Sequence, residues 1–197
     1  MRKGQLTKES IIEKAAPIFN KLGYAGASMS ALMQATGLQK GGIYNHFKTK
    51  EDIILQSFEY AIKKYNRAVF NAYRNEKTAL AKLRAIVNFY RTYPLNPVIE
   101  GGCPIINTAI DADNTLPQLK VRVKEVINTW IRNLSDIIKS GILQGEIKSS
   151  VNAHDASVVI ITTLQGGIVI SRSFEDNASM EIVVNKLLDY INFNLAK

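Results

Sequence analysis

The amino-acid sequence predicts an all-α protein, with an N-terminal helix-turn-helix head of three helices followed by a larger C-terminal helical bundle. Apolar residues recur at spacings of three and four in every long segment, which is the period of an amphipathic helix. No pair of segments alternates apolar and polar residues as two partner strands would. Near the N-terminus, two short helical segments flank a Gly-containing turn, as in a helix-turn-helix. We therefore expect one domain over residues 1–48 and a second, the bundle, over residues 49–197.

The first helix of the head is predicted over residues 7–22, and Gly23 should end it. Thr7 is the expected N-cap, and Ser10 is an alternative. Pro17 lies inside this helix, where it removes one backbone hydrogen bond, so we expect a local bend there. The face predicted to be buried carries Ile12, Ala15, Phe19 and Leu22.

Residues 28–50, SMSALMQATGLQKGGIYNHFKTK, form the most informative stretch of the chain. Ser28 suits an N-cap, and Gly37 suits the left-handed position after a helix. A second short helix is expected from about Gln39 to Phe47. It begins with Lys-Gly-Gly and continues with Tyr, Asn and His. A protein core could not bury that set, but the same set can lie against the phosphodiester backbone of DNA.

Positive charge is concentrated in the same part of the chain. Residues 1–50 hold eight Lys or Arg and two acidic residues, for a net charge of +6, whereas residues 51–197 hold seventeen and fifteen, for a net charge of +2. A concentrated positive field raises the affinity for polyanions. A solvated basic tail would also be positive, but here the basic residues are interleaved with an ordered apolar pattern, which favours DNA binding.

Four helices and a loop are expected in the first part of the bundle. Thr49 should cap a long helix that ends near Tyr73, with Glu51 and Asp52 in its first turn, where acidic residues stabilise a helix. Three of the five prolines and a Gly pair fall within residues 94–104 and predict a loop. The other three helices are expected at about residues 78–93, 104–112 and 116–143, and Gly145 marks the turn after the last.

Two closing helices are expected at about residues 153–173 and 179–195. The first is rich in β-branched residues, which would also suit a strand, but Asn152 and Asp155 form a helix N-terminal signature. This helix is apolar nearly all round, so it should be buried on more than one side. Because a monomer would expose one of those sides, we expect a homodimer through these two helices.

Composition indicates a protein of the cytoplasm. The mean hydropathy is near zero and long uninterrupted apolar runs are absent from the sequence, so no membrane span is expected. The N-terminal MRKG lacks the apolar stretch of a secretory signal. Cys103 is the single cysteine, which excludes an intrachain disulfide and fits a reducing compartment. We expect it to be either a buried small hydrophobe or a redox-sensing thiol.

The sequence gives little support to two other classes of function, an enzyme and a purely scaffolding protein. A small helical hydrolase would have to use Cys103 and His154 as nucleophile and base. The three Gly-Gly pairs lack the spacing of a phosphate-binding loop, and no cluster has metal-ligand spacing. We therefore expect no catalytic residue, no cofactor and no metal. A purely scaffolding helical protein would have no need of the uneven charge.

At the residues of the second short helix, the chain resembles the TetR/AcrR family of transcriptional repressors. The stretch GLQKGGIYNHFKTKEDI is similar to the family's signature, and KAAPIFNKLGYAGASMSALMQATG fits the same head, so the resemblance covers about residues 6–60. GGCPIINTAIDA and QGGIVISR are similar to one C-terminal subgroup of the family. The chain departs from the usual pattern at Ala31-Leu32-Met33, where an acidic or polar residue followed by Ile-Ala is common.

The resemblance implies a homodimer that binds a palindromic operator in double-stranded DNA and leaves it when a small molecule enters the C-terminal bundle. Phe47 is implied to turn inward as core. Only residues 39–41 and Asn45 could read base edges, and the others would contact phosphate. His46 could equally have a structural or capping role. The DNA-binding residues implied in this way are Ser28, Ser30, Gln39, Lys40, Gly41, Tyr44, Asn45, His46, Lys48 and Lys50.

The effector pocket implied by the resemblance lies between the helices at about residues 78–93, 103–112, 116–143 and 153–173. Few charges are expected on their inner faces, so an uncharged or weakly polar aromatic or lipophilic molecule is favoured over a phosphorylated one. Each candidate residue could also be an ordinary core or surface residue. The ligand-binding candidates are Phe89, Tyr90, Tyr93, Cys103, Asn107, Trp130 and Gln165.

Overall fold

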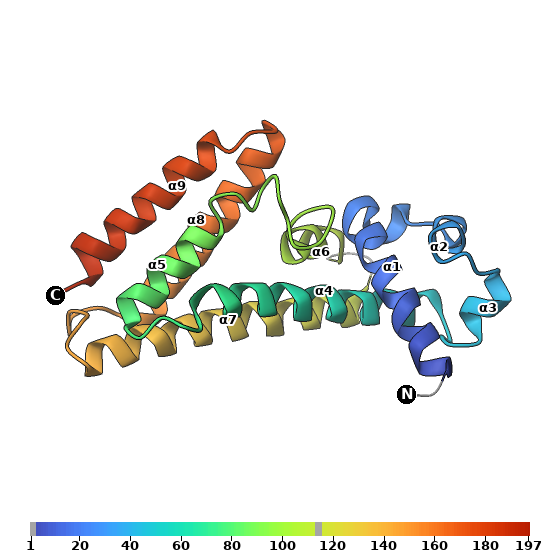
Figure 1. Cartoon of the computed structure of the whole chain (residues 1–197), viewed down its shortest axis with the longest axis horizontal. Helices are drawn as coiled ribbons and strands as arrows, with labels where there is room; N and C mark the ends of the chain where they lie inside the picture. Colours follow the sequence, from blue (N-terminus) through green and yellow to red (C-terminus); the bar gives the residue numbers. More distant parts are fainter. Residues whose placement is uncertain (1–2, 113–115) are drawn as a thin grey trace. The chain divides into compact units, whose positions relative to one another are not determined.

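The computed structural model describes residues 3–112 and 116–197. Within these ranges the chain forms nine α-helices and one short π-helix, and it forms no β-strand apart from an isolated bridge between Ile147 and Ala196 (Figure 1). The all-α prediction is therefore confirmed. The helices are α1 (Lys3–Gly26), α2 (Met29–Thr36), α3 (Lys40–Tyr44), α4 (Lys50–Tyr73), α5 (Ala79–Phe89), α6 (Pro104–Ala112), α7 (Pro117–Leu143), α8 (Ala153–Ser173), α9 (Ala178–Asp189) and the π-helix η1 (Tyr190–Leu195).

The chain packs into two compact units. Unit 1 contains Met1–Asn66 and Val98–Val123, and unit 2 contains Arg67–Pro97 and Lys124–Lys197. Helices α4 and α7 each continue from one unit into the other. Unit 1 therefore holds α6 and parts of α4 and α7 in addition to α1, α2 and α3. The functional boundary expected after residue 48 remains a prediction, because packing alone defines the two units.

Helix α1 starts earlier than the sequence predicts. Thr7 and Ser10, the two expected N-caps, lie inside the helix, so that prediction is wrong. The Gln5 side-chain amide donates to the Glu9 carboxylate at 2.8 Å, and such an i, i+4 pair supports the additional turn. The helix runs through Pro17 with helical backbone angles.

The first helix breaks at Gly23, as expected. Its φ of 72° and ψ of 170° are accessible to glycine and strained for other residues. One more helical turn follows, and the Ala27 N–H donates to the Gly23 carbonyl at 3.1 Å. The break redirects the chain from α1 into α2.

Helix α2 has both caps that the sequence predicts. The Ser28 hydroxyl accepts a hydrogen bond from the Ala31 N–H at 3.1 Å. At the other end, Gly37 has a φ of 71°, and its N–H donates to the Met33 carbonyl at 2.9 Å. Helix α2 packs against α1, and Leu32 is its fully buried residue.

Helix α3 is shorter than expected, because it ends at Tyr44 rather than near Phe47. The His46 N–H donates to the Ile43 carbonyl at 3.0 Å, an i→i−3 bond that closes the helix with a tight turn. This turn brings Phe47 into the core, where it is 2% exposed. Asn45 and His46 therefore lie in the turn after α3 and not on the helix itself.

The long helix α4 begins where the sequence predicts. The Thr49 hydroxyl accepts from the Asp52 N–H at 3.1 Å. Hydrogen bonds from its own backbone N–H and from the Thr49 hydroxyl lower the pKa of Glu51, so this carboxylate stays ionised in the first turn. Its buried face carries Ile53, Ile54, Phe58, Ala61, Ile62 and Tyr65.

Helix α5 has the predicted cap but ends four residues early. The Thr78 hydroxyl accepts from the Ala81 N–H at 3.1 Å, and the helix stops at Phe89 instead of reaching Tyr93. Tyr93 N–H donates to the Tyr90 carbonyl at 3.1 Å, so the chain continues in tight turns. Pro94 follows, and a residue before proline is driven out of the helical region.

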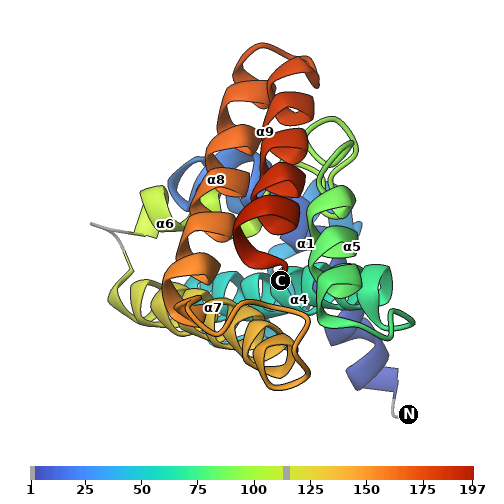
Figure 2. The same cartoon turned by 90° about the vertical axis from the view of Figure 1, so that its left-hand side faces the viewer.

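Helix α8 is a helix despite its β-branched residues, as predicted. The Asn152 side-chain oxygen accepts from the N–H groups of His154 and Asp155, at 3.0 and 3.3 Å. Within the residues that the structure describes, α8 is long and apolar enough to cross a membrane by length and composition alone. A core helix has the same composition, and α8 packs against α9 (Figure 2).

The α8–α9 contact is close because Gly167 has no side chain. A Cβ atom at this position would lie 3.0 Å from Met180 Cε and 3.1 Å from Val183 Cγ2. The Met180 N–H also donates to the buried Ser171 hydroxyl at 2.9 Å. Helix α9 ends at Asp189, and the expected C-terminal helix is completed by the π-helix η1.

In unit 1, a polar cluster attaches the end of α1 to the segment that leads into α6. We call it the Asn20 junction, and it consists of Asn20, Gly101 and Asn107. The Asn20 amide donates to the carbonyls of Glu100 and Gly102, at 2.9 and 3.0 Å. The Asn107 amide donates to the carbonyls of Asn20 and Gly101, at 2.8 and 2.9 Å.

Gly101 makes this junction possible. Its φ is 98°, and a Cβ atom there would lie 2.8 Å from the carbonyl carbon and oxygen of Asn20. The neighbouring atoms are backbone, so they cannot rotate away as a flexible side chain could.

We predict that Gly101→Ala lowers the free energy of unfolding by about 2–4 kcal/mol, because it adds a backbone clash to the strain of a positive φ. Gly145→Ala is the matched control. Gly145 has a φ of 73° and open space where a Cβ would lie, so only the strain of about 1–2 kcal/mol is expected. Denaturant unfolding measures both losses. Equal losses would show that the backbone contact does not contribute.

Candidate nucleic-acid interface

The helix-turn-helix is built around a small set of buried residues. Leu32 of α2, Ile43 of α3 and Phe47 after α3 are each at most 2% exposed. Burying these three apolar side chains fixes which face of α2 and α3 points inward. The polar residues of the same segment therefore lie on the outer face.

Most of the predicted DNA-binding residues are exposed in the structure. Tyr44 is 36% exposed, and its ring lies 6.0 Å from the Lys40 ammonium, within the range of a weak cation–π contact. His46 and Lys50 are half-buried. The exposed members of the set are Ser28, Ser30, Gln39, Lys40, Gly41, Tyr44, Asn45 and Lys48.

The two glycines of α3 differ in what surrounds them. A Cβ added at Gly41 would meet no atom within 4 Å, whereas one added at Gly42 would lie 3.6 Å from Leu38 Cβ. Gly41 therefore presents bare backbone to the outside, and Gly42 packs toward Leu38, four residues earlier. A surface without a side chain lets a bulky partner approach the helix closely.

The lysines of this face differ in their partners. Across residues 3–112 and 116–197, neither Lys40 nor Lys48 forms an ion pair with a carboxylate. Lys50 is engaged differently, because its ammonium donates to the Tyr24 carbonyl at 3.1 Å. Lys50 thereby connects the start of α4 to the end of α1.

The structure adds one basic residue that the sequence did not single out. The Lys8 ammonium of α1 lies 5.3 Å from the centroid of the Phe47 ring. This contact joins residues 39 positions apart, so no local pattern could have revealed it. Lys8 contributes a further positive charge beside the turn that follows α3.

The predicted ligand-binding residues are divided between the two units. Phe89, Tyr90 and Tyr93 form an aromatic cluster in unit 2, with ring centroids 5.2 to 5.7 Å apart. Trp130 and Gln165, both half-buried, belong to unit 2 as well. The other two candidates, Cys103 and Asn107, belong to unit 1.

The two candidates in unit 1 contribute to the hydrogen bonding and packing of that unit. Asn107 is part of the Asn20 junction, where its amide donates to backbone carbonyls. Cys103 is 1% exposed, in agreement with the expectation of a buried small side chain. The hydrolase alternative needs a thiol that a substrate can reach, and a buried Cys103 does not offer one. His154 lies exposed in the first turn of α8, with its Nδ1 3.3 Å from the Asp155 carboxylate.

The described residues contain no group of three or more His, Cys, Asp or Glu side chains that could hold a metal ion. An all-α fold with an exposed, basic helix-turn-helix defines a DNA-binding regulator. Two family models match the chain. "Bacterial regulatory proteins, tetR family" matches residues 11–56, and "Tetracyclin repressor-like, C-terminal domain" matches residues 79–187. The chain belongs to the TetR family of transcriptional regulators.

Solved structures agree with this assignment. A TetR transcriptional regulator from Chloroflexus aurantiacus is 38% identical over 100% of this chain and 99% of that one, with a TM-score of 0.96. A TetR-family regulator from Cytophaga hutchinsonii is 30% identical over 100% of this chain and 98% of that one, with a TM-score of 0.91. Among relatives by sequence, the fatty acid metabolism regulator protein of Bacillus subtilis is 24% identical over 78% of this chain and 77% of its own length.

We predict that Ser28→Ala lowers the free energy of unfolding by about 1 kcal/mol, because it removes the N-cap of α2. Ser30→Ala is the control, since Ser30 is exposed in the same turn and does not cap the helix. That variant should change stability by less than about 0.5 kcal/mol. Thermal or denaturant unfolding distinguishes the two, and equal effects would argue against a capping role for Ser28.

Proposed function

We propose that this chain is a cytoplasmic repressor that binds a palindromic operator as a homodimer and is released from it by a small-molecule effector. The observation that carries the DNA-binding part of this proposal is the outer face of α3. Lys40, Gly41 and Tyr44 combine a cation, bare backbone and an exposed phenol on one short helix. A helix buried in a protein core would not carry that combination of residues.

The exposed residues divide into two roles. In this proposal, residues 39–41 and Asn45 contact base edges in the major groove. The hydroxyls of Ser28 and Ser30, the Tyr44 phenol and the nearby lysines are suited to phosphate oxygens, which position the protein without reading sequence. His46 and Lys50 are half-buried, so they contribute at the edge of the contact.

We predict that Lys40→Ala and Tyr44→Phe each weaken operator binding by about 1–3 kcal/mol, because each removes a direct contact to DNA. Fluorescence anisotropy with the operator duplex, once selected from random DNA, measures the affinity. Lys139→Ala is a control outside the helix-turn-helix, at an exposed lysine of α7 whose ammonium lies 3.8 Å from Asp136. It should bind the operator as the wild type does.

Lys48→Ala should weaken binding to all DNA sequences alike, because a phosphate contact carries no sequence information. The slope of log affinity against log salt concentration should fall by about one. The same titration repeated at several salt concentrations gives this slope. If Lys40→Ala, Tyr44→Phe and Lys48→Ala all bind the operator like the wild type, the proposed docking of α3 is wrong.

The dimer part of the proposal rests on the outer face of α8. Val159 and Ile170 are 44% and 47% exposed on this apolar helix. Gly166 lies between them on the same helical face, and a Cβ there would meet no atom within 4 Å. Further exposed apolar residues of α8, the following turn and α9 are Val169, Phe174 and Ile182.

We propose that a second copy of the chain packs against this face of α8. Isologous contact of two such helices buries the same apolar patch twice, and the open Gly166 allows close helix approach. Two-fold symmetry would also place the two recognition helices about 34–36 Å apart, one turn of DNA.

We predict that Ile170→Glu converts the dimer into a monomer and strongly reduces operator affinity, because a charge would be buried at the interface. Light scattering on a size-exclusion column measures the mass. Leu143→Glu is the control, at an 88% exposed residue of α7 outside this face. A wild-type monomer at micromolar concentration that still binds the operator would contradict the proposal.

The effector part of the proposal is supported by the aromatic residues of unit 2. Phe89, Tyr90 and Tyr93 offer apolar faces together with phenol groups, and Trp130 and Gln165 add an indole and an amide. Such a mixture favours an uncharged aromatic or lipophilic ligand. A relative named as a regulator of fatty acid metabolism is consistent with a lipophilic effector. The effector must bind the DNA-free state more tightly, since equal affinity for both states shifts nothing.

A thermal-shift screen of small aromatic compounds, lipophilic acids and metabolites should give hits that also release the operator. We predict that Gln165→Phe lowers the affinity for such compounds at least about tenfold, equivalent to about 1.4 kcal/mol, because the larger side chain fills space near the ligand. Ser149→Phe, in an exposed turn, should leave their affinity unchanged. If Gln165→Phe leaves the affinity for every hit unchanged, the effector site lies elsewhere.

A further inference from the structure

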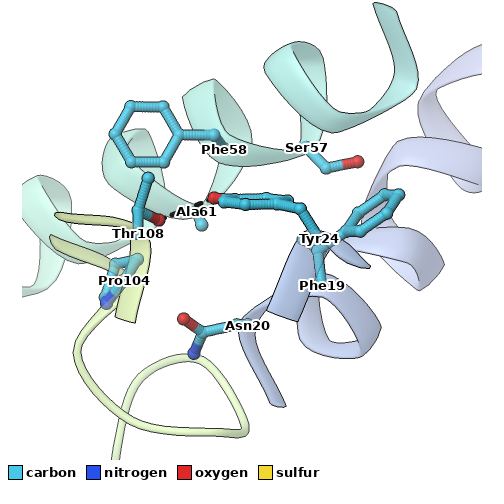
Figure 3. Close-up of a pocket in the computed structure, with 9 residues that line it drawn as sticks. Phe19, Asn20, Tyr24, Ser57, Phe58, Ala61, Pro104 and Thr108 are labelled. Atoms are coloured by element: carbon cyan, nitrogen blue, oxygen red, sulfur yellow. Dashed lines mark hydrogen bonds between the residues drawn. The ribbon is translucent and has the colours of Figure 1, made fainter. Parts of the chain in front are cut away.

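A small cavity lies inside unit 1 where α1, α4 and α6 meet (Figure 3). Its volume is about 10 Å³, close to the least space that holds one water molecule. None of the seven predicted effector-binding residues lines it. The lining residues are Ala16, Phe19, Asn20, Tyr24, Ser57, Phe58, Ala61, Pro104 and Thr108.

One hydroxyl in the wall of this cavity has no partner in the described part of the chain. Ser57 of α4 is 1% exposed, and its Oγ makes no hydrogen bond with any residue that the structure describes. A serine in a helix often donates to the carbonyl four residues earlier, but Ser57 does not. A buried hydroxyl without a partner costs about 1–3 kcal/mol, so a partner is expected.

Two further hydroxyls in the wall also have unused hydrogen-bonding capacity. The Tyr24 phenol and the Thr108 hydroxyl lie 2.6 Å apart and share one hydrogen bond (Figure 3). The pair carries two hydroxyl hydrogens, and one bond uses only one of them. The Asn20 side-chain oxygen accepts from the Asn107 amide at 3.2 Å and retains a second lone pair.

We propose that this cavity is a binding site for one ordered water molecule, held by the Ser57 hydroxyl and by at least one other polar group of the wall. A water can both accept and donate, so it can satisfy Ser57 whichever neighbour completes its bonding. The water would give the buried Ser57 hydroxyl of α4 the partner that it lacks among the described residues.

The chemistry of the wall excludes an ion as the occupant. Among the described residues, no Asp, Glu, Lys or Arg lines the cavity, and a bare charge there would be costly. Tyr24 is the one described lining residue that could ionise. Burial raises the pKa of Tyr24 to about 12, against the opposing effect of its hydrogen bond with Thr108, so the phenol stays neutral. A neutral site of this size matches water and no larger ligand.

The site differs from the proposed effector site in both location and role. It lies in unit 1, together with the helix-turn-helix, and its helices include α1, against which α2 packs. The water would therefore support the scaffold of the DNA-reading helices rather than signal the presence of a ligand.

High-resolution crystal structures of the full chain and of Ser57→Ala test the proposal directly. We expect density for a water within hydrogen-bond distance of Ser57 Oγ, and its loss in Ser57→Ala. A wild-type structure in which the cavity lacks this density and Ser57 Oγ donates to the Ile53 carbonyl overturns the proposal.

Thermal unfolding gives an independent test, because the two accounts predict opposite signs. If Ser57 holds a water, Ser57→Ala removes a hydrogen bond and should lower Tm by about 2–4 °C. If the hydroxyl has no partner or bonds its own helix, alanine should keep or raise Tm, because it favours helix.

Ser10→Ala, at an exposed position of α1, measures the effect of helix propensity alone. A rise in Tm for Ser57→Ala equal to that of Ser10→Ala would show that Ser57 does not hold the water. That result would overturn the proposal even if density were present in the cavity.

Discussion

The architecture of unit 1 depends on the close approach of the Gly101 backbone to Asn20. Because Gly101 lacks a Cβ, the segment that leads into α6 can come into contact with the backbone at the end of α1. The Asn20 amide then reaches two carbonyls of that segment, and Asn107 closes the network from α6. Helix α1 is fixed at this end, and α2 packs on α1. The placement of α2 and α3 within unit 1 thus depends on Gly101, a residue without a side chain.

Helix α3 illustrates how burial shapes the surface that we propose contacts DNA. Phe47 has to reach the core a few residues after the start of α3, so the helix ends at Tyr44 in a tight turn. The short helix leaves Lys40 and Tyr44 exposed and the backbone at Gly41 bare. Asn45 then lies in the turn, where its reach differs from that of a residue on the helix. The packing requirement and the proposed DNA contact therefore act on the same few residues.

Helix α8 carries one glycine on each of two faces, and the surroundings of these two glycines differ. Gly167 faces α9, where Met180 fills the space that a side chain would need. Gly166 faces outward, beside Val159 and Ile170, which the single chain leaves half-exposed. An apolar helix of this length has the composition of a membrane span, but one of its faces is already covered by α9. The uncovered face is the one that we assign to a second copy.

The sequence by itself determined the features that local physics decides: the all-α class, the order of the helices, and caps such as Ser28 and Gly37. These features depend on the helical period and on backbone hydrogen bonds within a few residues, so they can be predicted without knowledge of the fold. The tertiary structure alone decided that Lys50 binds the Tyr24 carbonyl, that Asn107 belongs to a junction, and that Ser57 faces a cavity. Each of these contacts joins residues that are far apart in the chain. Tertiary packing brings such residues together, so the local sequence pattern does not predict the contact.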